Sequence, residues 1–472
     1  MTHDHALSPL DAAFLHVETE YTPMHMASIG LFEGAPLRDR RGKFRLDDVR
    51  QLIGSRLDLV PKLRQKAFNG LLGEAPPVWL DHLEFDIAEH VRICSVPSPG
   101  TEAELRELCA ELLSEPLDRV RPLWELVFVD GLADGRIAVL EKLHHSMADG
   151  LAAAELATVL LDLTPEPVAS GDTPRWEPYP RLTVWRAAVD DLVRLGGIPL
   201  RVASWGVGSV THPVRRAKEL FALGRAVSTI ANPRIIAPRS SLNRHQISAA
   251  RSVEFVRLPF ADMHEVAHAF GATVNDVLLT LVAGGLHALL EGRGELDEKS
   301  ELQVLVPVGL TDPNGRGLGN KVSALFVRLP VGFKDPLDIL HVVSAEVRHE
   351  KQMHQELAAS TMLGLLEPLP QGVLAVLAGV IQHQPFFNLI VTNVPGPSIP
   401  LYALGAKMVE AFPIVPLAGN LSLGVAALSY EGQLNLGILS DPVTCPDVEL
   451  FCEGVRTSLR GLVDASKATV RH

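Results

Sequence analysis

The sequence predicts an α/β protein built from two halves that are joined by a basic crossover. Its 472 residues exceed one ordinary core, so two domains of roughly 150–200 residues are expected. Strand-like apolar runs and helical spacing alternate both early and late in the chain. Proline-rich and then arginine-rich stretches separate the two regions. We therefore predict an N-terminal subdomain over residues 1–160, a linker and basic helical crossover over 161–251, and a C-terminal subdomain over 252–472.

The composition excludes several classes of protein. Hydrophobic residues make up 47% of the chain, which supports well-packed cores. A formal net charge of −13 argues against a general nucleic-acid binder. The four cysteines form no CxxC pair, which fits a reducing compartment. No basic stretch followed by an apolar core opens the chain, so we expect no signal peptide and a cytoplasmic protein.

The first half is expected to contain both strands and helices. Its strand-like runs at 123–129 and 136–143 are separated by a turn at 131–135, which predicts an antiparallel hairpin. The other expected elements are a strand at 26–32 and helices at 47–59, 102–114 and 151–156.

The middle of the chain changes character twice. Residues 161–180 are rich in proline and predict a linker. Residues 181–251 hold twelve Lys and Arg against three acidic residues, with apolar side chains interleaved. One interpretation is a crossover helix with a solvated basic face. The other is contact with an anionic surface, either lipid headgroups or the phosphates of a nucleotide cofactor.

The second half repeats the α/β pattern. A long buried helix is expected to begin near Thr273, with Thr273 or Asn275 as its N-cap. The apolar runs at 277–290 and 372–381 fall short of the roughly 20 residues that cross a bilayer, so both are expected to be buried helices. The other expected elements are strands at 253–258, 302–308, 323–329 and 389–392, a helix at 261–270, and a hairpin formed by 421–430 and 434–439.

The most informative motif is the HHxxxDG run at residues 144–150, directly after the strand at 136–143. Histidine can take and return a proton near neutral pH, so the run predicts a proton-transfer site. A metal site is the alternative, because imidazole and carboxylate both bind zinc or iron. Adjacent residues on a strand point to opposite faces, and no second ligand cluster stands out. We therefore expect no metal, with one histidine facing the reactants and the other buried in the fold.

Several further segments accompany this motif in a fixed order. They are LSPLD at 7–11, PMHM at 23–26, RPLWE at 121–125, SLN at 241–243, VNDV at 274–277, NVPGP at 393–397 and LSY at 428–430. Together they resemble the bacterial wax ester synthase/diacylglycerol acyltransferase family over nearly the whole length. HHxxxDG alone also occurs in peptide-synthetase condensation domains. One departure is that Arg244 and His245 follow the SLN segment, where a glycine and a proline are frequent in the family.

The resemblance implies a fold and a reaction. The fold is two chloramphenicol-acetyltransferase-like, or condensation-domain-like, subdomains with a channel between them. Acyl-CoA would donate a long-chain acyl group to diacylglycerol or to a long-chain alcohol, giving triacylglycerol or wax ester, with no cofactor beyond acyl-CoA as co-substrate. Attachment to a membrane or lipid-droplet surface would fit such insoluble substrates. The alternatives are a related acyltransferase with another alcohol or amine acceptor, or a catalytically silent lipid-binding or droplet protein.

The resemblance also implies roles for the motif residues. His145 would be the general base, and His144 would belong to the structural face. Asp149 would orient the loop through an arginine, for which Arg64 is the favoured partner. Gly150 would leave room for the pantetheine arm of CoA. No covalent acyl-enzyme is expected, because no GxSxG elbow surrounds the rival nucleophile Ser146.

The tetrahedral oxyanion of such a reaction needs hydrogen-bond donors. The candidates from the second half are Asn275, Thr392 and Asn393. Structural alternatives stay open for two of them, since Asn275 would also serve as a helix cap and Asn393 would also shape the turn before Pro395.

Overall fold

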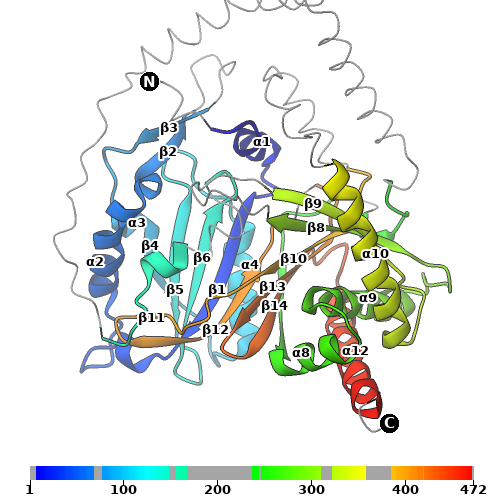
Figure 1. Cartoon of the computed structure of the whole chain (residues 1–472). Coiled ribbons are helices and arrows are strands. Elements are labelled where there is room, and N and C mark those ends of the chain that lie inside the picture. Colours follow the sequence, from blue (N-terminus) through cyan, green and yellow to red (C-terminus); the bar gives the residue numbers. More distant parts are fainter. Residues whose placement is uncertain are drawn as a thin grey trace, which may run out of the picture.

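The described residues form two six-stranded sheets and a two-stranded ribbon, with helices packed around them (Figure 1). The structure is a computed structural model that describes residues 7–68, 77–147, 156–166, 236–243, 246–309, 322–357, 384–417 and 419–469. The predicted α/β class is confirmed. Most of the helix expected at 151–156 lies outside the described residues, although residues 156–160 are helical. The apolar run at 372–381 and most of the linker and basic crossover also lie outside them.

The N-terminal sheet has the strand order β11-β12-β1-β6-β5-β4. Its strands are β1 (His25–Phe32), β4 (Val91–Ser95), β5 (Trp124–Asp130), β6 (Ile137–His144), β11 (Tyr402–Ala403) and β12 (Ala406–Ile414). The predicted hairpin is confirmed, because β5 and β6 pair antiparallel. On its other side β6 pairs antiparallel with β1, with His144 opposite His25. β6 is therefore an interior strand, held along both edges.

The helices of the first half follow clear sequence signals. α4 (Glu102–Ser114) has the predicted bounds and begins at a capping box in which Thr101 and Glu104 satisfy each other's backbone N–H groups. α2 (Leu46–Arg56) tightens at its end into the short helix η2 (Leu57–Leu59), so the expected helix at 47–59 is confirmed in two pieces. The other elements are α1 (Pro9–Val17), η1 (Ala35–Leu37), η3 (Pro61–Arg64), α3 (Ile87–His90) and the ribbon β2 (Gln65–Phe68) with β3 (Val78–Asp81).

The C-terminal sheet is mixed and has the order β7-β14-β13-β10-β8-β9. Its strands are β7 (Ser252–Pro259), β8 (Leu302–Gly309), β9 (Val322–Leu329), β10 (Leu389–Val394), β13 (Leu423–Tyr430) and β14 (Gln433–Ser440). The predicted hairpin is confirmed as β13–β14. Its two turn residues, Glu431 and Gly432, both have positive φ, as a two-residue hairpin turn requires.

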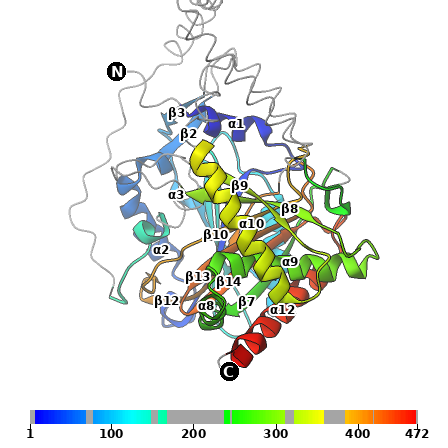
Figure 2. The same cartoon turned by 45° about the vertical axis from the view of Figure 1, so that its right-hand side comes forward.

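Three long helices pack together against this sheet, with α10 crossing its front in Figure 2. They are α9 (Val274–Gly292), α10 (Pro336–Leu357) and α12 (Val448–Thr469), and the shorter α8 (Phe260–Ala269) lies beside them. Thr273 caps α9 in a capping box with Asp276, so the alternative cap Asn275 is wrong. By length and composition α9 could cross a membrane, but 72% of its most apolar stretch is buried inside the molecule. The prediction of a buried helix here is confirmed.

Two strands from the second half of the chain, β11 and β12, belong to the first sheet. β12 pairs antiparallel with β1, so that Ile414 lies opposite Ala27 and Ala411 opposite Gly30. β11 extends the same edge by pairing with β12. The N-terminal sheet is thus completed by β12, which begins more than 370 positions after the end of its partner β1.

Candidate active site

The two histidines lie where β6 leaves the N-terminal sheet. His144 is the last residue of β6, and His145, Ser146 and Met147 turn away from it. Backbone hydrogen bonds fix this turn: the N–H of His145 donates to the Met24 carbonyl at 2.9 Å, and that of Met147 donates to the His144 carbonyl at 2.8 Å. The last motif residues, including the predicted Asp149 and Gly150, lie outside the described residues.

Both ring nitrogens of His144 face protein groups. The side chain is fully buried, and its Nδ1 accepts a hydrogen bond from the Ser146 N–H at 3.1 Å. Because a backbone N–H can only donate, this network assigns the lone pair to Nδ1 and the proton to Nε2. The Nε2 atom lies 3.5 Å from Oε1 of Glu18. The Ser146 Oγ lies 2.7 Å from Nδ1 and completes the enclosure.

Glu18, which the sequence analysis did not identify, supports His144 from the end of α1. Burial raises the pKa of the Glu18 carboxyl, but the interactions with His144, the Met24 N–H and Arg119 outweigh it and lower the pKa to about 2. The Arg119 guanidinium donates to Glu18 Oε2 at 2.7 Å. No sequence pattern pairs positions 18, 119 and 144, since only the fold brings them together.

His145 is placed differently from its neighbour. Its side chain is half-buried, and its ring stacks on Phe14 of α1 with 4.0 Å between centroids and 20° between planes. Stacking on an aromatic ring fixes the plane of the imidazole. The sequence prediction that the two histidines have different surroundings therefore agrees with their burial.

Lys62 is a second residue that the sequence analysis missed. Its ammonium donates to the Met147 carbonyl at 2.7 Å and lies 4.9 Å from the centre of the Trp79 ring. Burial lowers the pKa of Lys62. The ammonium thus holds the carbonyl end of the turn that presents His145. The sequence offered one indication of Lys62, because it lies in η3 only two residues before Arg64, which was predicted to contact the motif.

Arg64 lies near this turn with partners of its own. Its guanidinium pairs with Asp58 at 3.1 Å and stacks over the Phe85 ring at 5.2 Å. The expected link between Arg64 and Asp149 stays a prediction, because residue 149 lies outside the described ranges.

The oxyanion candidates belong to the other sheet and its helix. Asn275 is the second residue of α9 and is half-buried. Thr392 and Asn393 are consecutive, half-buried residues of β10, opposite Ala426 and Ala427 of β13. Thr392 and Asn393 therefore lie on a strand of the C-terminal sheet, whereas His145 follows a strand of the N-terminal sheet. Their role as oxyanion donors stays a prediction.

The SLN segment anchors loops to the C-terminal sheet. Arg293, the C-cap of α9, donates to Ser241 Oγ at 2.8 Å, and Asn388 donates its side-chain N–H to Asn243 Oδ1 at 2.8 Å. Leu242 is fully buried in the core of the second half. These contacts give the segment a structural role. Arg244 and His245, where the sequence departs from the family pattern, lie outside the described residues.

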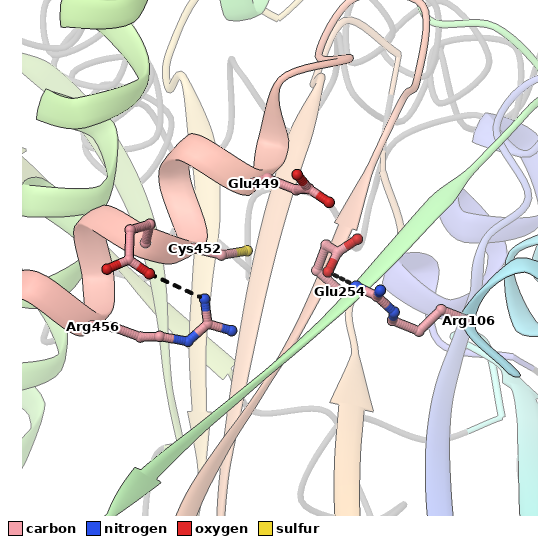
Figure 3. A pocket seen from close by; sticks show the side chains of 6 residues that line it. Arg106, Glu254, Glu449, Cys452 and Arg456 are labelled. Carbon is pink, nitrogen blue, oxygen red and sulfur yellow. Dashed lines mark hydrogen bonds and ion pairs between the residues drawn. The ribbon is translucent and has the colours of Figure 1, made fainter. Parts of the chain in front are cut away.

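A polar pocket at the seam of α4, β7 and α12 contains none of the predicted site residues (Figure 3). Arg106 pairs with Glu254 there, and Arg456 lies 3.7 Å from Glu453. Burial raises the pKa of the Cys452 thiol to about 12, which disfavours the thiolate form that acts as a nucleophile. Across the described ranges, no group of three or more His, Cys, Asp or Glu side chains is placed to hold a metal ion.

Comparison with protein families identifies matches over most of the chain. Residues 7–278 match the model described as the wax ester synthase/diacylglycerol acyltransferase catalytic domain, and residues 318–462 match its C-terminal domain. A Mycobacterium tuberculosis protein named as a diacylglycerol O-acyltransferase is 32% identical over 98% of this chain and 90% of its own length. A Mycobacterium bovis protein named in the same way is 31% identical over 98% of this chain and 96% of its own.

Solved structures share the fold. The wax ester synthase/diacylglycerol acyltransferase of Marinobacter aquaeolei VT8 superposes with a TM-score of 0.68 at 25% identity, covering 98% of this chain and 100% of that one. The trichothecene 15-O-acetyltransferase of Fusarium sporotrichioides gives 0.62 at 11% identity, covering 97% and 94%. A starter condensation domain of rhizomide synthetase gives 0.56 at 15% identity, covering 98% and 95%. The predicted condensation-domain-like fold is confirmed.

Proposed function

Because this chain belongs to the wax ester synthase/diacylglycerol acyltransferase family, we propose that it transfers a long-chain acyl group from acyl-CoA to a lipid hydroxyl. The acceptor is diacylglycerol, a long-chain alcohol or both, and the product is triacylglycerol or wax ester. The reaction requires no cofactor beyond acyl-CoA as co-substrate.

The observation that carries the assignment of the base is the contrast between the two histidines. His144 is fully buried, and each of its ring nitrogens faces a protein group. His145, one residue later, is half-buried and held in plane by Phe14. A base must reach the proton that it removes, so the accessible imidazole is the better candidate.

In the proposed reaction, His145 takes the proton of the acceptor hydroxyl as its oxygen attacks the thioester carbonyl. The new C–O bond forms, and the C–S bond then breaks as the tetrahedral intermediate collapses. His145 returns the proton to the departing thiolate, which leaves as CoA. Asn275, Thr392 and Asn393 are the proposed donors to the oxyanion. Asp149 is proposed to orient the loop, and Gly150 to leave room for the pantetheine arm.

A covalent route through Ser146 is disfavoured by burial. Ser146 contacts His144, which in turn lies near Glu18, an order of groups that resembles a serine triad. However, the Ser146 side chain has no exposed surface, so a thioester carbonyl cannot approach it without opening the turn. We therefore propose direct transfer between the two bound substrates.

The test is an ester-synthesis assay with radiolabelled palmitoyl-CoA and either hexadecanol or dioleoylglycerol, followed by separation of the lipids. His145→Ala is expected to lower turnover roughly 10²–10⁴-fold while the protein remains folded, because a general base contributes about this much. His144→Ala is expected to lower the melting temperature, because it empties a buried site. His264→Ala, at an exposed position of α8, is the control.

Three outcomes would contradict these assignments. A monodisperse His145→Ala variant with near wild-type turnover refutes the base. A His144→Ala variant that melts like the wild type yet is inactive means that the two roles are reversed. No labelled ester with either acceptor refutes the proposed function.

A further inference from the structure

Glu141 is an acidic residue in the interior of the N-terminal sheet that the proposed mechanism does not use. It lies on β6, opposite Ser28 of β1 on one side and Leu126 of β5 on the other. Burial alone raises the pKa of its carboxyl to about 7. No cation or hydrogen-bond donor from the described residues offsets this burial. The side chain is half-buried in the free protein, so a ligand that covers it would remove its contact with water and would have to supply a hydrogen-bond partner.

The surroundings of Glu141 form an accessible row across three strands. Ser28 is the single residue of β1 that is not buried. It lies opposite Glu141 on one side and opposite Pro413 of β12 on the other, and both of these residues are half-buried. Residues paired across strands share a face of the sheet, so Pro413, Ser28 and Glu141 stand side by side. On the same face Met26 and Leu143, one step nearer the motif, are buried.

This row lies on the same face of the sheet as His145. The ladder between β1 and β6 stays in register to the turn, because the His145 N–H still bonds to the Met24 carbonyl. Side chains alternate along a strand, so positions 141, 143 and 145 point to one side, and Cα atoms four residues apart are separated by about 13 Å. After a hydrogen bond of about 2.8 Å at each end is subtracted, the remaining span suits a glycerol backbone with an ester group.

We infer that the carboxyl group of Glu141, with the Ser28 hydroxyl beside it, contacts the acyl acceptor and favours one that carries a second oxygen function, such as the ester carbonyl of diacylglycerol, over a plain long-chain alcohol. The inference rests on the proposed function and names its preferred acceptor class. Near neutral pH the protonated carboxyl can donate to an ester carbonyl. An alkyl chain in the same place leaves the carboxyl unpaired, and a site with an unpaired buried group discriminates against that ligand.

The test compares kcat/KM for dioleoylglycerol and hexadecanol, with palmitoyl-CoA held constant, in the full-length protein. Glu141→Leu is expected to lower the dioleoylglycerol-to-hexadecanol ratio roughly 10- to 100-fold, because it removes the donor but keeps the volume. Glu141→Gln keeps an N–H donor and is expected to restore most of the ratio. Ser28→Ala is expected to lower the ratio by a smaller factor. Glu107→Leu, at an exposed position of α4, is the matched control.

The outcomes separate this inference from the proposed function. If the wild type makes no ester with either acceptor, the proposed function fails first. If it makes both, and Glu141→Leu leaves the ratio unchanged or lowers both rates equally, the inference is overturned. The comparison is then repeated with a shorter acyl-CoA, and an effect of Glu141→Leu that follows only the length of the acyl chain also overturns the inference, because Glu141 then faces the acyl donor. If Glu141→Leu does not fold, an unchanged ratio in Ser28→Ala overturns the inference.

Discussion

At the scale of single residues, the site depends on charged side chains that hold the HHxxxDG turn in place. His144 is enclosed by Ser146 and Glu18, and Glu18 is itself paired with Arg119. Lys62 holds the far side of the turn through the Met147 carbonyl. These residues touch no substrate in the proposed mechanism. They determine where the imidazole of His145 stands, and a displacement of about 1 Å at such a group can cost roughly 100-fold in rate.

Glu18→Gln provides a test of this arrangement through its dependence on pH. The folded-state pKa of Glu18 is lowered to about 2, so its ionisation stabilises the protein above pH 4.5, and this contribution is lost as pH falls toward 2. The variant is expected to lose about 3 kcal/mol of unfolding free energy at pH 7, an upper limit set by the size of the shift. Denaturant unfolding at pH 7 and pH 3 measures the difference.

Glu20→Gln, at an exposed position two residues away, is the control for loss of charge. The variant Glu18→Gln should show a flatter dependence of stability on pH between 4.5 and 2 than the wild type does. If the two curves stay parallel over that range, Glu18 is not the group that stabilises the turn.

At the scale of elements, α9 and α12 approach so closely that side chains are excluded between them. A Cβ atom at Gly284 of α9 would lie 1.8 Å from Ser458 Oγ, and one at Gly454 of α12 would lie 2.7 Å from the Gly284 carbonyl oxygen. Glycine is a poor helix former, by about 1 kcal/mol relative to alanine. Its presence in the interior of both helices is explained by this contact.

Gly284→Ala is therefore expected to destabilise the protein by about 1–3 kcal/mol, because overpacking outweighs the gain in helix propensity. Gly54→Ala is the matched control, since Gly54 lies within α2 and an added Cβ there meets nothing within 4 Å. That variant is expected to gain up to about 1 kcal/mol. Chemical denaturation compares the two, and equal effects of the same sign would refute the packing argument. Ser458→Gly should rescue Gly284→Ala.

Elements that depend on local signals could be predicted from the sequence, whereas elements that depend on pairing between distant segments could not. The hairpins β5–β6 and β13–β14 and the helix α4 could be predicted because their turns and caps are local signals. β12 was missed because no local feature of the sequence indicates that it pairs with β1. The same holds for the site. Strand alternation separated His144 from His145, but Glu18, Lys62 and Glu141 depend on contacts between distant segments.

At the scale of the whole molecule, charge is distributed unevenly along the chain. Residues 181–251 carry nine net positive charges in a protein whose total is −13, which leaves −22 on the remainder. Insoluble substrates require the enzyme to meet a lipid surface, and an anionic surface attracts such a basic segment by about 1 kcal/mol per Lys or Arg. We propose on this ground that the enzyme binds peripherally to membranes or lipid droplets.

This proposal predicts binding to vesicles of anionic lipid that weakens as salt is raised. Replacing Arg215, Arg216 and Lys218 with glutamine is expected to reduce the bound fraction in vesicle sedimentation, with vesicles of neutral lipid as the control. Replacement of Arg40, Arg41 and Lys43, which are exposed and lie outside the segment, controls for net charge. Unchanged binding at low salt would show that the segment is not the contact.

The pairing of β12 with β1 also has a consequence for the synthesis of the protein. β1 leaves the ribosome about 380 residues before β12, which at 5–20 residues per second is a delay of roughly 20–80 s. During that time β1 has an open edge, and open edges are templates for pairing with other chains. The nascent protein must keep this edge protected until Ala406–Ile414 arrive. Conditions that slow translation of the second half should therefore increase aggregation of the first.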